Sequence, residues 1–128
     1  MGYCIYQKES KFAVKKNVNL ENILTDIKNL YNIYNDNDLS WVEKSEVMEA
    51  LTIEDIFEAW RWEIKRDDET KEVNGIAFAG EKFGDCEVLF ETINKYVKSG
   101  SYIRMYGEDG ERWTWKFTNK GFTVVQKW

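Results

Sequence analysis

The amino-acid sequence predicts an α+β fold, in which a mostly antiparallel sheet carries helices packed on one of its faces. Two observations predict it. Apolar residues recur at helical spacing in several segments, and short runs of alternating apolar and polar residues lie near both ends of the chain and between the helical segments. Most runs are joined by short turns, which favour antiparallel pairing. The predicted order is two strands, two helices, two strands, one helix and three strands.

Residues 1–128 are expected to form a single domain. Hydrophobic residues make up 43% of the sequence and charged residues 32%, which is typical of a folded rather than a disordered chain. No apolar run approaches the roughly 18 residues that a membrane span needs. Because no signal-peptide pattern follows Met1, we expect a cytoplasmic protein in which Cys4 and Cys86 stay reduced.

The N-terminal segments 3–7 and 12–14 are predicted to form a short hairpin or two short strands at a sheet edge. Asn19 is the predicted N-cap of the first helix, because its side chain can accept a hydrogen bond from a first-turn N–H. The polar segment 35–38 is expected to end this helix. One apolar stripe runs along it: Leu20, Ile23, Leu24, Ile27, Leu30, Tyr31 and Tyr34.

Between residues 39 and 51 we expect a loop that contains Trp41, followed by one short helix from Ser45. Thr52 is the predicted N-cap of the next helix, and Asp55 lies in its first turn, where a negative charge is favourable. The apolar stripe of this helix is Ile53, Ile56, Phe57 and Trp60.

Segments 62–66 and 73–79 are predicted to form a second hairpin, joined by a charged loop. The last helix is expected to begin after an Asp85 N-cap and to end at Gly100, which would adopt the left-handed conformation of a C-cap. Its apolar stripe is Val88, Leu89, Ile93, Tyr96 and Val97.

The C-terminal segment 99–128 is predicted to form a three-stranded antiparallel meander. A three-residue loop over 108–110, with a left-handed Gly110, pairs Met105 with Trp113 and Ile103 with Trp115. A four-residue loop would instead divide the apolar residues between both faces, so we predict the three-residue loop. The outward residues are then Tyr102, Arg104, Tyr106, Arg112, Thr114 and Lys116.

The N-terminal MGY and the segments EKFGDCEVLFETINKYV and GSYIRMYGEDGERWTWKF together resemble a family of small uncharacterised proteins of bacteria, phages and other mobile elements. The resemblance spans most of the chain, from Met1 to Phe117, and its most specific part is GEDGERWTWKF. It implies no activity for any residue. It implies a genomic setting in which anti-defence proteins, toxin antagonists and regulators are common.

The composition argues against most enzymatic sites. The chain has no histidine, which removes the side chain best suited to proton transfer near neutral pH and all histidine-bearing zinc sites. The phosphate-binding glycine motifs are absent. Cys86, in the first turn of a helix, is interpreted as a small buried residue rather than a reactive thiol. We therefore expect a non-enzymatic protein without a metal or cofactor.

The net charge of −5 disfavours direct binding of nucleic acid by the chain as a whole. Our first hypothesis is a protein-binding module, an inhibitor or antagonist of the anti-CRISPR type encoded by a phage or mobile element, that engages a basic protein surface through acidic helices. The alternative is that the acidic residues of these helices only keep the protein surface soluble. The candidate partner-binding residues are Glu43, Glu46, Glu49, Glu54, Asp55 and Glu58.

The alternative hypothesis is a binder of a small, nucleotide-like or anionic compound. It uses aromatic and arginine residues, which are frequent at binding hot spots, on the outer side of the meander. The candidate ligand-binding residues are Tyr102, Arg104, Tyr106 and Arg112. A hydrolase built on carboxylates such as Glu63, Glu91 and Glu111 is a third and weaker alternative.

Overall fold

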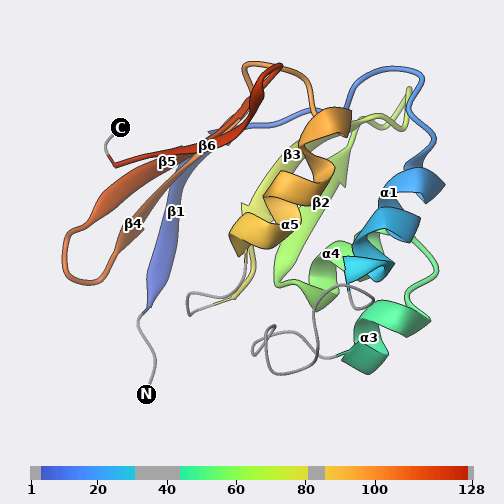
Figure 1. Cartoon of the computed structure of the whole chain (residues 1–128), viewed down its shortest axis with the longest axis horizontal. Coiled ribbons are helices and arrows are strands. Elements are labelled where there is room, and N and C mark those ends of the chain that lie inside the picture. The colour runs from blue at the N-terminus through green and yellow to red at the C-terminus, as the bar shows by residue number, and fades with distance from the viewer. Residues whose placement is uncertain (1–3, 31–43, 81–85, 127–128) are drawn as a thin grey trace.

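The computed structural model describes residues 4–30, 44–80 and 86–126, which fold into helices and two antiparallel sheets (Figure 1). The α+β class is confirmed, and the order of elements follows the prediction, although one strand rather than two precedes the first helix. The strands are β1 (Ile5–Lys11), β2 (Trp62–Arg66), β3 (Val73–Phe78), β4 (Tyr102–Gly107), β5 (Arg112–Thr118) and β6 (Gly121–Val125). The helices are α1 (Leu20–Lys28), α3 (Lys44–Glu49), α4 (Ile53–Ala59) and α5 (Cys86–Ile93), which continues into the 3-10 turn η1 (Asn94–Tyr96).

The larger sheet has the strand order β1-β4-β5-β6 and contains the predicted meander. Met105 pairs with Trp113 and Ile103 with Trp115, so the predicted register is confirmed. The turn between β4 and β5 needs a left-handed residue, and Gly110 supplies it with a φ of 89°. Strand β1 pairs antiparallel with β4, so the N-terminal strand joins the sheet that contains the C-terminal meander.

The N-terminal region forms one strand, β1, rather than the predicted hairpin or pair of short edge strands. After β1, Val14 makes only an isolated bridge with Val97. The backbone groups that a hairpin would pair are used elsewhere, because Val14 N–H donates to the Val73 carbonyl and Lys15 N–H to the Tyr96 carbonyl. Long-range pairing therefore replaces the local hairpin in this region.

Two predicted helix N-caps are confirmed. The Asn19 side chain accepts a hydrogen bond from Glu21 N–H at 3.0 Å, and Thr52 Oγ1 accepts one from Asp55 N–H at 3.1 Å. Helix α3 occupies the place of the predicted short helix. The predictions for four residues lie outside the described part of the chain: Tyr31, Tyr34, Trp41 and the N-cap Asp85.

Gly100 is left-handed, with a φ of 96°, but it does not cap the helix as predicted. The helical segment already ends at Val97, whose extended backbone joins the bridge with Val14. Gly100 N–H donates to the Phe117 carbonyl at 2.9 Å, so this glycine turns the chain into the sheet instead.

The core lies between the inner face of the larger sheet, helix α5 and the β2-β3 hairpin. Trp62 of β2, Phe90 of α5 and Trp115 of β5 meet with ring centroids 5.1 to 6.0 Å apart, in tilted or edge-on contacts that aromatic rings favour. Cys86 is buried beside them, as predicted, and its sulfur accepts a hydrogen bond from Trp62 Nε1 at 3.3 Å.

Gln7 joins the two sheets. Its side-chain Nε2 donates to the Ile76 carbonyl at 3.1 Å, and its Oε1 accepts from Phe78 N–H at 2.7 Å. The amide of Gln7 thus pairs with the backbone of β3 much as a neighbouring strand would. Gln7 therefore satisfies backbone groups of β3 at the junction of the two sheets.

The described helices lie on the inner side of the larger sheet, with α1, α3 and α4 gathered at the far end of the molecule (Figure 1). The outer side of β1, β4, β5 and β6 carries none of them. No helix among the described residues is long and apolar enough to cross a membrane.

Candidate functional site

The outer face of the larger sheet consists of three rows of cross-strand neighbours. The first row is Lys11, Tyr102, Lys116 and Thr123; the second is Glu9, Arg104, Thr114 and Val125; the third is Tyr6, Tyr106 and Arg112. All four predicted ligand-binding residues lie in these rows. The alternation of the strands therefore brings them together on one surface.

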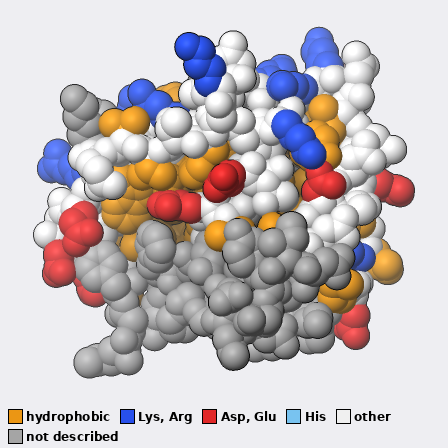
Figure 2. All heavy atoms as spheres, viewed as in Figure 1, with side chains coloured by type: hydrophobic (Ala, Val, Ile, Leu, Met, Phe, Trp, Pro, Cys, Tyr) orange, Lys and Arg blue, Asp and Glu red, His pale blue; other side chains and the backbone are white. Residues whose placement is uncertain are grey.

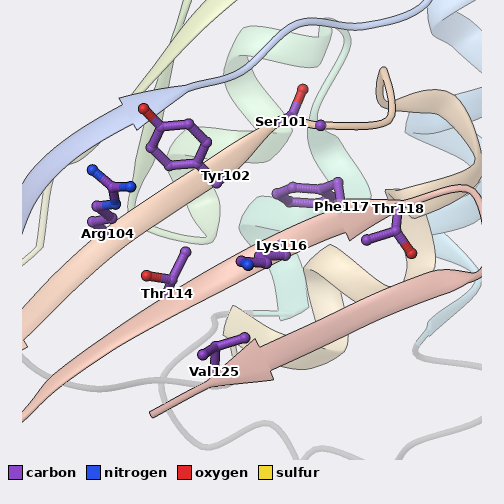
Figure 3. A pocket seen from close by; sticks show the side chains of 9 residues that line it. Ser101, Tyr102, Arg104, Thr114, Lys116, Phe117, Thr118 and Val125 are labelled. Atoms are coloured by element: carbon purple, nitrogen blue, oxygen red, sulfur yellow. The ribbon is translucent and has the colours of Figure 1, made fainter. Parts of the chain in front are cut away.

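A pocket of about 340 Å³ opens at the first two rows, where β4, β5 and β6 lie side by side (Figure 3). The pocket forms here because Thr114 and Val125 of the second row have short side chains. Longer side chains, including that of Arg104, stand around them. Thr114 points outward as predicted but is only 3% exposed. The pocket is lined by Gly100, Ser101, Tyr102, Arg104, Thr114, Lys116, Phe117, Thr118 and Val125.

Arg104 is held in place at this pocket from two sides. It forms an ion pair with Glu9 of β1, and its guanidinium carbon lies 4.7 Å from the centroid of the Tyr102 ring. Its Nε has no hydrogen-bond partner among the described residues. Because a guanidinium has five N–H donors, a single carboxylate does not use its full capacity. Arg104 is thus oriented, and because its Nε is buried, an anion would bind through the N–H groups at the end of the guanidinium.

Tyr6 and Tyr106 form a stacked pair in the third row. Their ring centroids are 5.2 Å apart with an interplanar angle of 28°, and the two residues are 45% and 37% exposed. Arg112 is the cross-strand neighbour of Tyr106 on the other side. The third row therefore presents aromatic surface and a cation to the solvent.

Lys116 and Tyr6 are among the members of this surface that were missed as site residues. Lys116 faces Tyr102 in the predicted register and was assigned to the outward set, so the signal was present in the sequence. Tyr6 lies about a hundred residues before Tyr106, and no local pattern predicts that β1 pairs with β4. Only the folded sheet places it there.

The predicted acidic surface is divided in the structure. Glu49 of α3 and Asp55 and Glu58 of α4 line an open hollow of about 430 Å³ together with Ala50 and Ala59. Glu46 lies in α3, but its side chain is outside the described set, and Glu43 lies outside the described residues. Three of the six predicted carboxylates are therefore brought together.

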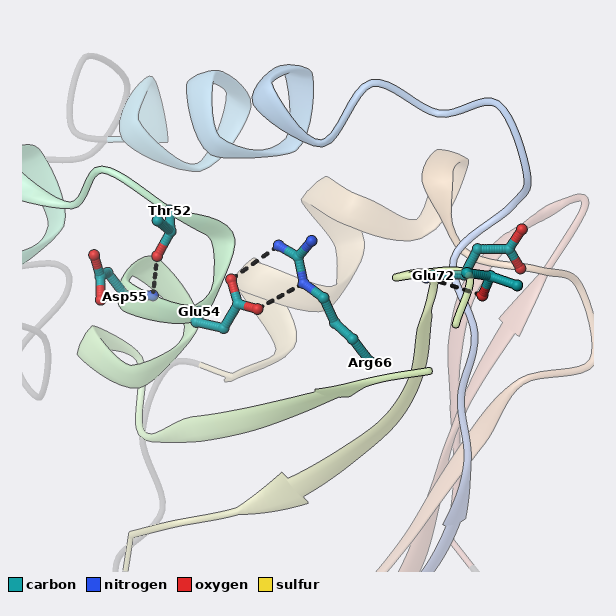
Figure 4. A network of polar contacts seen from close by, with 6 residues as sticks. Thr52, Glu54, Asp55, Arg66 and Glu72 are labelled. Carbon is teal, nitrogen blue, oxygen red and sulfur yellow. Dashed lines mark hydrogen bonds and ion pairs between the residues drawn. The ribbon is translucent and has the colours of Figure 1, made fainter. Parts of the chain in front are cut away.

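Glu54 does not share this hollow. Its carboxylate takes a two-point ion pair with Arg66 of β2, with an Oε2–Nε distance of 2.6 Å and an Oε1–Nη2 distance of 2.9 Å (Figure 4). This pair links α4 to the β2-β3 hairpin. Glu54 thus has a structural partner and is a poor candidate for binding a separate protein.

Apolar side chains lie beside the acidic hollow. Met48 at the end of α3 is 45% exposed, and Leu51 in the connection to α4 is 83% exposed. Figure 2, which has the same viewpoint as Figure 1, shows Lys and Arg gathered mainly along the upper part of the molecule and Asp and Glu mainly below. The two signs of charge are thus largely separated on this side.

A small cluster of charged and polar side chains connects helix α1 to the η1 turn. Asp26 accepts a hydrogen bond from the Tyr96 hydroxyl and forms an ion pair with Lys95 at 3.2 Å. The hydrogen bond and the charge of Asp26 raise the pKa of Lys95. The pKa of Tyr96 is raised first by burial and then by its hydrogen bond to Asp26. This cluster is structural, since it lies outside both candidate surfaces.

Among the described residues, no group of three or more Cys, Asp or Glu side chains is arranged to hold a metal ion. The chain matches no protein-family model, no curated protein and no solved structure.

Proposed function

We propose that this protein is a non-enzymatic binding module that holds a small anionic, nucleotide-like compound on the outer face of its larger sheet. The observation that supports this best is the pocket in which Arg104 and Lys116 lie with hydroxyl side chains around a concave surface. Its volume of about 340 Å³ lies in the range of small-ligand sites, which is about 300 to 1,000 Å³.

The chemistry of the lining favours an anion with an apolar part. Arg104 and Lys116 supply positive charge, and the hydroxyl groups of Thr114 and Thr118 belong to the same lining. Arg104 covers one face of the Tyr102 ring, so a flat group such as a base would stack on the other face. A phosphate joined to a base combines these two properties.

A non-enzymatic role is proposed because the pocket offers little for proton transfer. None of the nine described residues that line it is a carboxylate, a histidine or a cysteine. The groups present can bind and orient a compound.

A thermal-shift screen with mononucleotides, pyrophosphate and inorganic phosphate tests the proposal. A ligand that binds only the folded state raises the melting temperature. The variant Lys116→Gln should weaken binding of the best compound about tenfold or more, while Lys65→Gln on β2, outside the pocket, should bind as the wild type does. If no anion shifts the melting temperature, or if both variants behave alike, the proposal fails.

A second candidate function is binding of a basic protein surface, as an inhibitor or antagonist encoded by a phage or mobile element. It is favoured by the convergence of Glu49, Asp55 and Glu58 from two helices, next to the exposed Leu51. Carboxylates around an apolar residue suit a basic partner, including a nucleic-acid-binding groove whose phosphates they would replace.

Charge reversal at the acidic hollow tests this second candidate. Glu49→Lys with Glu58→Lys should abolish capture of a partner from the producing cell. Glu54 is left unchanged, because its ion pair with Arg66 would make loss of stability and loss of binding indistinguishable. Glu69→Lys, in the loop between β2 and β3, is the matched control. Capture that survives the double reversal would reject the candidate.

A further inference from the structure

We propose that the outer face binds single-stranded nucleic acid along its three rows, with the pocket as the site of one nucleotide. This inference rests on the proposed function and extends it from a small ligand to a polymer. Three properties of the surface support it: its charge, its aromatic residues and its length. The register of the strands shows which residues lie on this face and so fixes all three.

The charge of the outer face is opposite to that of the whole chain. The chain has a net charge of −5, yet the three rows contain the cations Lys11, Arg104, Arg112 and Lys116 against the single carboxylate of Glu9. The net charge of the chain is thus a poor guide to this face. A polyanion is the occupant that this surface complements.

Acidic residues limit the surface at one end. Glu108, Asp109 and Glu111 lie in the turn beyond the third row, and a Glu108 carboxylate oxygen accepts a hydrogen bond from Cys4 N–H. The positive side chains Lys11 and Lys116 lie in the first row, at the opposite end. We therefore expect phosphates to concentrate at the pocket end of the face.

Aromatic rings lie beside these cations in the first and third rows. Tyr102 lies between Lys11 and Lys116 in its row, and Tyr106 lies between Tyr6 and Arg112. Proteins that bind single strands combine a positive surface for the backbone with rings on which bases stack. The exposed sides of the Tyr6 and Tyr106 rings provide such a platform, and Tyr102 provides a second at the pocket.

The length of the surface favours a polymer over a single nucleotide. Tyr102 and Tyr106 are four residues apart on β4, which corresponds to about 13 Å at the usual rise per residue. A ligand the size of the pocket would leave the Tyr6–Tyr106 pair uncovered. A single strand that passes from the pocket to the third row would contact both aromatic platforms.

The shape of the face favours a single strand over a duplex. The bases of a duplex are stacked on each other, so tyrosines on a sheet face cannot stack on them without unpairing. The described part of the chain places no helix on this side that could enter a groove.

Fluorescence anisotropy with an oligothymidylate of about twelve nucleotides tests the inference, since known single-strand-binding OB-folds contact about 4 to 16 nucleotides. The double variant Tyr6→Thr with Tyr106→Thr should weaken binding about tenfold or more without changing the salt dependence. Lys11→Gln with Lys116→Gln should reduce the slope of log affinity against log salt by about 1.4, because each phosphate contact contributes about 0.7. Lys65→Gln should change neither quantity. Melting temperatures show that each variant is folded.

Several results would overturn the inference: a duplex of the same length that binds as tightly, tyrosine variants that bind normally, or heparin that binds equally well. If mononucleotides occupy the pocket while the oligonucleotide gains nothing from Tyr6 and Tyr106, the inference fails and the proposed function stands. If the oligonucleotide binds as expected but no small anion shifts the melting temperature, the inference stands and the small-ligand function fails.

Discussion

The inner and outer faces of β4 and β5 are made by alternate residues of the same two strands, yet their properties are opposite. On the inner face Met105, Trp115 and Phe117 are fully buried, and the Trp115 and Phe117 rings pack on Phe90 of α5. On the outer face Arg104 and Tyr106 remain partly exposed. The comparison teaches that one face of the sheet is committed to stability, so the other can vary in chemistry and carry recognition.

The largest expected effect comes from the inner face. Trp115→Ala removes a side chain that is 0% exposed and contacts Trp62 and Phe90. We expect a loss of about 3 to 5 kcal/mol in the free energy of unfolding, because such a truncation leaves a cavity as well as losing burial. Urea denaturation measures it. A loss below about 1 kcal/mol would mean that the inner face does not organise the core.

A polar residue of the inner side is expected to be structural too. Gln7→Leu removes both side-chain hydrogen bonds to the backbone of β3 and leaves those backbone groups without these partners. The Ile76 carbonyl keeps its hydrogen bond from the Ser10 hydroxyl, so Phe78 N–H is the group left without its acceptor. We expect a loss of about 1 to 3 kcal/mol, the usual result of leaving one such polar group unsatisfied. Gln7→Glu, which keeps an acceptor for Phe78 N–H but not the donor, is the matched comparison in the same denaturation experiment. Equal stability of Gln7→Leu and the wild type would show that the hydrogen bonds of Gln7 to β3 do not stabilise the contact between the two sheets.

The outer face should contribute far less to stability. Tyr106→Ala loses its stacked pair with Tyr6, and cross-strand pairs of this kind contribute about 0.2 to 1 kcal/mol. Thermal denaturation should therefore show a small decrease for Tyr106→Ala, while Lys116→Gln should stay within about 0.5 kcal/mol of the wild type. A decrease as large as that of Trp115→Ala would remove the contrast between the two faces.

The smallest effect concerns pH and lies away from both faces. The pKa values of Lys95 and Tyr96 are raised in the folded state, so their stabilisation is complete below their ordinary values near pH 10 and is lost as the pH rises through the folded pKa values. Asp26→Asn should lower the melting temperature at pH 7 slightly and reduce its fall above about pH 10. Some fall should persist, because burial is the largest cause of the shift of Tyr96. Parallel curves for the two proteins would exclude Asp26 as the cause.

The local features of the fold could be predicted from the sequence. The caps at Asn19 and Thr52, the left-handed Gly110 and the pairing of Ile103 with Trp115 all follow from short-range patterns. Each depends on residues within a few positions or across one turn. The same patterns predicted that Tyr102, Arg104, Tyr106 and Arg112 share one face.

The features that could not be predicted depend on residues far apart in the chain. Glu54 was expected to face a partner, but Arg66, twelve residues later in β2, occupies its carboxylate. Segment 12–14 was expected to join a hairpin, but the carbonyl of Val73 and Val97 provide its partners. A hydrogen-bonding group takes whichever partner the fold brings near, and the local sequence does not identify that partner.

The sequence by itself determined the fold class and the alternation that separates an apolar face from a polar one, because a side-chain period of two is a property of any strand. Which residues complete the candidate site around Tyr102, Arg104, Tyr106 and Arg112 depends on the tertiary structure. The pairing of β1 with β4 adds Tyr6, Glu9 and Lys11 to the outer face, and the packing of β4, β5 and β6 forms the pocket at Arg104 and Lys116. A pocket depends on side chains from several strands at once, so it exists only after those strands have paired.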